Sequence, residues 1–225
     1  MDVIEPVDHG LIDREGVHVA WELYGSGEAT VTFPPVFNIA HSRLWKAQVP
    51  WLARHFRVLA VDPRGNGRSD RPTDPAQFGA FVVAGDVIAA LDAAGVERTV
   101  LVGNSMGSLY SVLVAAMQPE RVAGIVHIDT GINLTGDYSD PLSKALACFE
   151  QELDTDEGWA SFNRHVWERD WPKAAEFFVR QANTDSHSGR AREEGLEWAL
   201  EADPRSTRAL TVELARGYND ESLQA

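Results

Sequence analysis

The segment Gly103–Gly107 reads Gly-Asn-Ser-Met-Gly, and its central residue, Ser105, is the one best placed for covalent chemistry. An apolar run, Thr99–Val102, precedes the segment, and an apolar helical pattern, Leu109–Gln118, follows it. A serine between a buried strand and a helix lies on a sharp, strained turn, and small flanking residues let the strand and the helix pass closely. The start of the helix directs free N–H groups at the same place. We therefore predict that Ser105 is a nucleophile; the alternative is a serine at a tight turn or a helix N-cap.

A serine hydroxyl attacks a carbonyl only when a base removes its proton and an acid orients that base. Asp129 follows the apolar run Gly124–Ile128 and is the first candidate for the acid, with capping of the next turn as the alternative. His127 lies within that run, so we expect a packed core histidine rather than a base. His41 is expected to line a substrate pocket or, with the serine after it, to cap the following helix. No base for Ser105 is evident in the sequence.

The elements that must position Ser105 alternate between strands and helices. Short continuous apolar runs are typical of buried parallel strands, and an apolar-polar alternation is typical of a half-buried antiparallel strand. The predicted strands are Val17–Tyr24, Val31–Phe33, Arg57–Asp62, Thr99–Val102 and Gly124–Ile128, and the predicted helices are Gln77–Ala94 and Leu109–Gln118. This order predicts an α/β fold in which helices flank a mostly parallel central sheet.

The character of the sequence changes after Thr130. A polar loop is expected over Ile132–Asp140, and the stretch from Pro141 to about Ala202 is helical in pattern and rich in tryptophan and phenylalanine. We interpret it as a helical lid whose aromatic side chains form a small core of their own and an apolar roof for a substrate. The predicted organisation is a core over residues 1–131, a helical lid or cap over 132–205, and the start of a return to the core over 206–225.

Three segments together resemble the α/β-hydrolase fold superfamily: Gly103–Gly107, Val61–Ser69 and Trp45–Phe56. The second resembles the loop after the family's fourth strand, and the third resembles its first helix. The resemblance implies the chain order Ser, then Asp or Glu, then His, and some relatives, such as haloalkane dehalogenases, place the acid where Asp129 stands. The family's last two strands and its histidine have no counterpart before Ala225, so the resemblance implies roughly 60 to 70 further residues.

The resemblance also implies an oxyanion hole built from two backbone N–H groups. These belong to Phe37 and Met106, and we expect His41 and Asn104 to line the substrate pocket. The family's His-Gly pair is replaced here by Pro35 and Val36, which changes the loop. A backbone donor does not depend on the type of side chain, so the donor itself is retained; a rigid turn without this role is the alternative.

These features predict a serine hydrolase that acts on a small to medium apolar ester or a related carbonyl substrate. C–C bond hydrolysis is a close variant, because Gly-Asn-Ser-Met-Gly also occurs in relatives that cleave ring-fission products. The alternative is a catalytically impaired module that binds a ligand as a sensor. The replaced loop residues and the absent histidine favour that alternative, and the intact Gly-x-Ser-x-Gly segment favours the enzyme.

Composition narrows the partners and the compartment. The formal net charge is -14 without clustered lysine and arginine, which disfavours nucleic acid. The single cysteine, Cys148, fits a reducing compartment, and Met1–Gly10 lacks the features of a secretory signal. No apolar run approaches the roughly 20 residues that cross a bilayer. The acidic run Glu150–Glu157 lacks the central glycine of a calcium loop. We expect a cytoplasmic protein with a small-molecule substrate, no cofactor, no metal, and no nucleic-acid or membrane partner.

Overall fold

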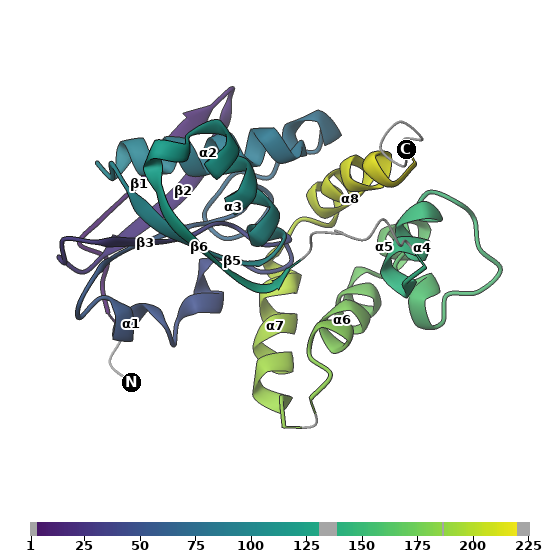
Figure 1. Ribbon diagram of the computed structural model, residues 1–225. Coiled ribbons are helices and arrows are strands. Elements are labelled where there is room, and N and C mark those ends of the chain that lie inside the picture. Colours follow the sequence, from purple (N-terminus) through teal and green to yellow (C-terminus); the bar gives the residue numbers. More distant parts are fainter. Residues whose placement is uncertain (1–3, 131–138, 186, 220–225) are drawn as a thin grey trace. The chain divides into compact units, whose positions relative to one another are not determined.

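A six-stranded sheet forms the centre of the N-terminal part of the chain (Figure 1). The computed structural model describes residues 4–130, 139–185 and 187–219. The strand order is β1-β2-β4-β3-β5-β6. The pairs β1/β2 and β2/β4 are antiparallel, whereas β4, β3, β5 and β6 run parallel to one another. The strands are β1 (Asp8–Arg14), β2 (Val17–Tyr24), β3 (Thr30–Phe33), β4 (Arg57–Val61), β5 (Thr99–Ser105) and β6 (Val122–Thr130). The predicted α/β fold with a mostly parallel sheet is confirmed.

Helices cover both faces of this sheet. Successive side chains of a strand point to opposite faces, so neighbouring residues pack in different hydrophobic clusters. On one face, α2 (Ala80–Ala93) and α3 (Met106–Met117) pack on the strands, and Leu59 belongs to that side. On the other face, Val58 packs with Trp45 and Phe33 near α1 (Val49–Leu52). Figure 1 shows α1 on one side of the sheet and α2 and α3 on the other. Val58 and Leu59 are both fully buried, which is why this strand reads as a continuous apolar run.

Two predicted helices are divided in the structure. The expected helix Trp45–Phe56 is replaced by a 3₁₀ turn, η1 (Ser42–Trp45), and the single α-helical turn α1. Pro50 lies in the first turn of α1 and has no N–H to continue a helix from the residues before it. The expected helix Gln77–Ala94 consists of η2 (Pro75–Phe78) and α2, which are separated by Gly79, whose ψ of 140° is not helical.

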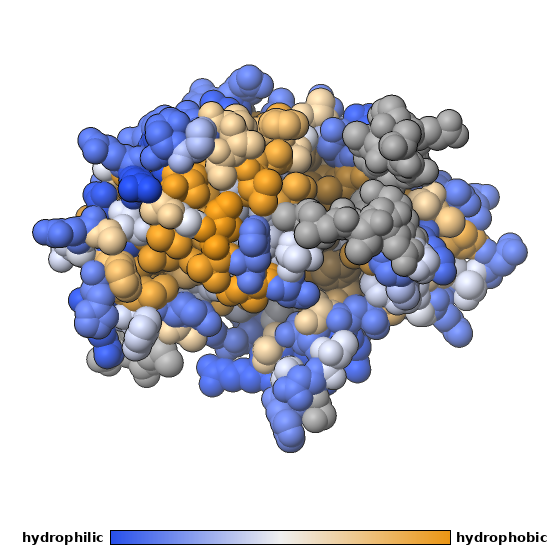
Figure 2. Space-filling view, in the orientation of Figure 1, coloured by the Kyte–Doolittle hydropathy of each residue, from blue (hydrophilic) through white to orange (hydrophobic). Residues whose placement is uncertain are grey.

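Strand β6 lies at one edge of the sheet and pairs with β5 in the described part of the chain. Val126 and Ile128 are 48% and 43% exposed, and Figure 2 shows apolar side chains gathered on the visible face of the sheet. His127, between them, is also exposed. The expectation that His127 is a packed core residue is therefore wrong, because an edge strand does not bury its side chains on both faces as an interior parallel strand does.

The chain divides into two compact units. The first contains Met1–Arg71 and Ala80–Ile132, and the second contains Pro72–Gly79 and Asn133–Ala225. Most of the polar loop expected over Ile132–Asp140 lies outside the described residues. The second unit comprises η2, α4 (Pro141–Ala147), η4 (Gly158–Ser161), α5 (Arg164–Arg169), α6 (Trp171–Ala182), α7 (Gly189–Glu201) and α8 (Pro204–Asn219).

The second unit has an aromatic core of its own. Phe149, Phe162 and Trp167 are at most 4% exposed. The Trp167 ring lies edge-on to both phenylalanines, with centroid distances of 4.8 Å to Phe149 and 5.0 Å to Phe162. Such arrangements add to the burial of apolar area. Residues 206–219, expected to begin a return to the sheet core, lie in α8, which packs on α4 and η2 inside this unit.

None of the helices within the described residues is long and apolar enough to cross a bilayer.

Candidate functional site

Ser105 lies at the junction between β5 and α3 and has a strained backbone. Its φ and ψ angles are 50° and −120°, a conformation that residues with a Cβ rarely adopt. Close packing at the junction explains the flanking glycines: a Cβ on Gly103 would lie 2.4 Å from the Gly107 carbonyl oxygen. The sharp strand-to-helix turn expected from the sequence is therefore present, and α3 begins with Met106 directly after the serine.

The strain at Ser105 has a measurable consequence. Replacing Ser105 with glycine should raise the free energy of unfolding by about 1–2 kcal/mol, because glycine adopts this conformation without steric cost and only part of the gain is lost to its freer unfolded chain. Ser105→Ala is the matched control and should leave stability nearly unchanged, because alanine keeps the Cβ. Urea denaturation of the three proteins measures the difference. Equal stability of the glycine and alanine variants would contradict a strained turn.

The loop after β3 lies against the first turn of α3. The carbonyl oxygens of Pro35 and Pro34 are 3.1 Å and 3.4 Å from the position of a Cβ on Gly107. Phe37 follows in this loop; it is 8% exposed, and its carbonyl accepts a hydrogen bond from the Ala40 N–H at 3.1 Å. Because β3 and β5 are parallel neighbours, the segments that follow them meet at the same edge of the sheet. Phe37 and Met106 thus come from neighbouring segments, as expected for the two residues assigned to the oxyanion hole.

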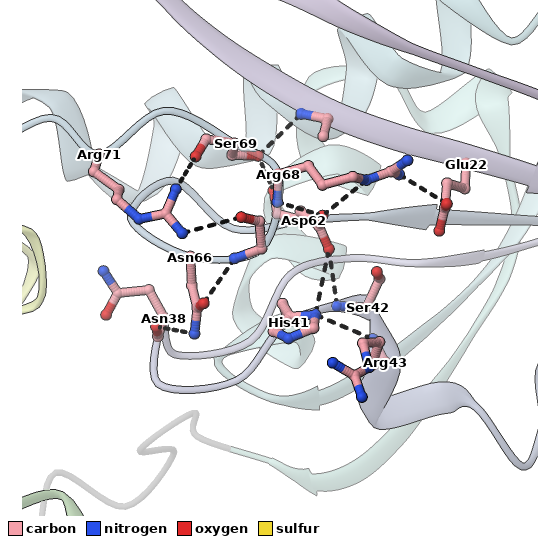
Figure 3. A network of polar contacts seen from close by, with 12 residues as sticks. Glu22, Asn38, His41, Ser42, Arg43, Asp62, Asn66, Arg68, Ser69 and Arg71 are labelled. Atoms are coloured by element: carbon pink, nitrogen blue, oxygen red, sulfur yellow. Dashed lines mark hydrogen bonds and ion pairs between the residues drawn. The ribbon is translucent and has the colours of Figure 1, made fainter. Parts of the chain in front are cut away.

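A buried aspartate joins that loop to the loop after β4 (Figure 3). The Asp62 carboxylate, 3% exposed, accepts hydrogen bonds from the Ser42 N–H and the Arg68 N–H, both at 3.0 Å. Asn66 donates from its side-chain Nδ2 to the Asn38 carbonyl at 3.0 Å. Backbone groups satisfied in this way hold the loop in one conformation. The sequence indicated the Val61–Ser69 motif but not these roles.

His41 belongs to the same network. It is 5% exposed, and its Nδ1 lies 4.0 Å from the nearer Asp62 oxygen and 3.5 Å from the Arg43 N–H. The contact with the Arg43 N–H makes His41 the N-cap of η1, which is one of the two roles expected from the sequence.

Asp129 lies next to Ser105 along the edge of the sheet. In the pairing of β5 with β6, Asn104 is opposite Ile128 and Ser105 is opposite Thr130. The register therefore shifts by one residue between these two pairs, and Asp129 is the extra residue of a β-bulge. Asp129 is exposed and has a φ of 46°, and Asn104 is partly buried. The structure therefore brings Ser105 and Asp129 to neighbouring strand ends, whereas His127 pairs with Gly103 further along the strand.

Tyr110 is a buried residue of α3 and contacts the first residue of that helix, Met106. It is 1% exposed, and its hydroxyl donates to the Met106 sulfur at 3.9 Å. Burial raises the pKa of the Tyr110 hydroxyl far above its ordinary value, and the nearby Asp86 carboxylate raises it further. The hydroxyl stays protonated and can hold the Met106 side chain in place.

The acidic run of the second unit lines a cavity of about 660 Å³. Asp156 contributes to it and forms ion pairs with Arg169 at 2.8 Å and Lys173 at 2.9 Å. Lys173 and Arg169 lower the pKa of this carboxyl. Across the described ranges, no three His, Cys, Asp or Glu side chains are grouped so that they could hold a metal ion.

A family model and several known proteins match this chain. The family model described as the alpha/beta hydrolase fold matches residues 38–200. Epoxide hydrolase 2 of Siraitia grosvenorii is 28% identical over 126 residues, which cover 56% of this chain and 39% of that protein. The 2-hydroxymuconate semialdehyde hydrolase of Pseudomonas sp. strain CF600 is 40% identical over 82 residues, covering 36% of this chain and 29% of that one.

Among solved structures, the enol-lactonase from Burkholderia xenovorans LB400 is similar with a TM-score of 0.64 at 19% identity, covering 91% of this chain and 73% of the lactonase. At this identity the likeness shows the fold. The chain spans 39% of the length of the epoxide hydrolase relative, which is less than half.

Proposed function

Because the chain belongs to the alpha/beta hydrolase fold family, we propose that it is a hydrolase in which Ser105 is the nucleophile, acting on a small to medium apolar ester or a related carbonyl substrate. The observation that carries the proposal is the strained conformation of Ser105 between β5 and α3, beside the loop that contains Phe37. Strain of this kind persists where the surrounding structure imposes it, and it is concentrated at functional sites.

In the proposed reaction, the Ser105 oxygen attacks the carbonyl carbon of the substrate. The Met106 and Phe37 N–H groups stabilise the negative charge that develops on the carbonyl oxygen. The base in this reaction is the histidine of the family's order Ser, acid, His. This histidine accepts the serine proton and returns it to the leaving group, and Asp129 orients the histidine. Water then hydrolyses the acyl-enzyme ester and restores the serine.

The epoxide hydrolase relatives raise the question of whether an epoxide could be the substrate. A serine oxygen that opened an epoxide would become an ether, which water does not cleave under mild conditions, so the enzyme would stop after one turnover. Attack on a carbonyl gives an ester, which water does cleave. Ser105 therefore favours a carbonyl substrate. The relative named 2-hydroxymuconate semialdehyde hydrolase supports C–C bond hydrolysis as the close variant.

Labelling with a fluorophosphonate probe tests the nucleophile. We expect the full-length protein to be labelled at Ser105, and Ser105→Ala to lose at least about 10³-fold in labelling rate, because the phosphorus must bond to an activated serine oxygen. Ser26→Ala is the control, since Ser26 is an exposed serine in the irregular segment after β2, and this variant should be labelled as the wild type is. Labelling that survives in Ser105→Ala would refute the assignment.

A second candidate is a module that binds a ligand without turnover, and one observation favours it. Pro35 and Val36 stand where the resemblance places His-Gly in the loop against α3. Tight binding of a small ester or lactone by a protein that neither labels nor turns over would support this candidate over the enzyme. We propose a cytoplasmic location for either, because Cys148 is the single cysteine of the sequence.

A further inference from the structure

The Asn38 side chain is buried, and its polar atoms have no hydrogen-bond partner among the residues that the structure describes. The residue is 0% exposed, and neither its Nδ2 nor its Oδ1 has a hydrogen-bond partner in the structure as described. A buried carboxamide offers two donors and an acceptor, and leaving them unsatisfied is costly. Buried polar groups in folded proteins are paired with few exceptions, and each exception calls for a cause.

The backbone around Asn38 is held firmly, so the side chain is not left over from a loose loop. The Asn38 carbonyl accepts from Asn66 Nδ2 at 3.0 Å, and the preceding carbonyl, of Phe37, accepts from the Ala40 N–H at 3.1 Å. Figure 3 shows the Asn38 carboxamide directed away from the Asp62 carboxylate and the network around it. The polar network nearest to Asn38 thus fixes its main chain and leaves its side-chain atoms available.

The position of Asn38 connects it with Ser105. Asn38 directly follows Phe37 in the loop after β3, and the start of that loop packs on Gly107, two residues after the serine. Strands β3 and β5 are parallel neighbours, so Asn38 and Ser105 both follow strand ends at one edge of the sheet. In open α/β sheets this edge is where ligands bind.

We propose that the Asn38 carboxamide binds the substrate that Ser105 attacks, and that the acyl part of this substrate carries one group with a donor and an acceptor side by side, as a carboxamide has. Such a group satisfies Nδ2–H and Oδ1 together, whereas an apolar acyl chain leaves both unpaired. The inference rests on the proposed function and narrows it, from an apolar ester to an otherwise apolar ester with one amide-like group.

Three matched aryl esters test the proposal. The p-nitrophenyl esters of succinamic, 4-oxopentanoic and 4-methylpentanoic acid have similar shapes; the second lacks the donor, and the third lacks the donor and the acceptor. The full-length wild type should have a kcat/KM about 10- to 100-fold higher for the succinamate than for the 4-methylpentanoate, since a site built for hydrogen bonding rejects an analogue that leaves it unpaired. The oxopentanoate should fall between them.

The decisive variant is Asn38→Leu, which keeps the volume and removes both polar atoms. It should bring the ratio of the two kcat/KM values close to one, keep Ser105 reactive to fluorophosphonate, and leave the thermal midpoint equal or higher, because no hydrogen bond is lost. Asn163→Leu is the matched control. Asn163 is 2% exposed, and its Nδ2 donates to the carbonyls of Cys148 and Gln151. This control should lower the midpoint and preserve the ratio.

The outcomes separate the two proposals. Equal hydrolysis of the amide and apolar esters by the wild type, or an unchanged preference in Asn38→Leu, overturns the inference and leaves the serine hydrolase standing. A lower midpoint of Asn38→Leu together with an unchanged preference identifies a structural role and likewise overturns it. Failure of the wild type to hydrolyse any of the esters, together with absent labelling of Ser105, overturns the proposed function and the inference with it.

Discussion

Replacing Arg64 with methionine should lower the free energy of unfolding by about 3–5 kcal/mol. The Arg64 side chain is 1% exposed and makes two parallel contacts with Asp86, from Nε to Oδ2 at 2.6 Å and from Nη2 to Oδ1 at 2.7 Å. The Asp86 carboxylate is 3% exposed. Without Arg64, the remaining ion pair described for Asp86 is the one with Arg14, at 3.3 Å. The pair joins the loop after β4 to α2, so its loss also loosens that loop. Urea denaturation at neutral pH measures the change.

This experiment has two controls: a variant that replaces both Arg64 and Asp86, and a variant that breaks an exposed ion pair elsewhere in the chain. Arg64→Met combined with Asp86→Leu should recover most of the loss, because no uncompensated charge is left in the interior. Arg190→Met breaks the exposed pair of Arg190 with Glu194, 2.9 Å apart, and should cost at most about 0.5 kcal/mol. A loss below about 1 kcal/mol in the single variant Arg64→Met would show that the Asp86 charge is not confined to a dry interior.

Gly103→Ala should be the second severe substitution, with a loss of about 3 kcal/mol or more and a large fall in Ser105 labelling. The added Cβ would lie 2.4 Å from the Gly107 oxygen and 2.6 Å from the Ser108 Cα. Both are backbone atoms, so relief requires α3 to move away from β5, and Ser105 lies on the turn between them. Denaturation and fluorophosphonate labelling of the same preparation measure the two effects together.

Gly124→Ala is the matched control, because it makes the same change in β6 and a Cβ there meets no atom within 4 Å. We expect a stability within about 0.5 kcal/mol of the wild type, or slightly above it, since alanine restricts the unfolded chain more than glycine does. Normal stability and labelling of Gly103→Ala would mean that the strand and the helix have room to separate at this junction.

The parts of the fold that could be predicted are those in which burial imposes a pattern on neighbouring residues. Val58 and Leu59 are fully buried on opposite faces of the sheet, and this produced the apolar run from which β4 was predicted. Strand β1 was not predicted because it is polar and largely exposed, and it owes its conformation to pairing with β2. A strand specified by its neighbour leaves little trace in its own sequence.

The same distinction applies to the candidate site. Ser105 could be identified because a strained strand-to-helix turn needs small residues at fixed offsets. The role of Asp62 could not, since it binds the Ser42 N–H, 20 positions earlier, and that contact exists only because β3 lies beside β4 in the sheet. Asn38 could not be identified either, because its burial without a partner among the described residues can be seen only in the folded structure. The exposure of His127 likewise follows from the strand order, which places β6 at an edge.

The division of the chain into two units sets a rule for exchanging parts between relatives. Because Pro72–Gly79 belongs to the helical unit, the chain passes from one unit to the other three times, after Arg71, Gly79 and Ile132. The short segment is bound to α8, where the Ser206 hydroxyl donates to the Pro72 carbonyl at 2.6 Å. A graft that replaced only the residues after Ile132 would separate partners that pack together. We therefore expect functional chimaeras only when Pro72–Gly79 and the residues after Ile132 come from the same parent, because these two separate segments of sequence form one structural unit.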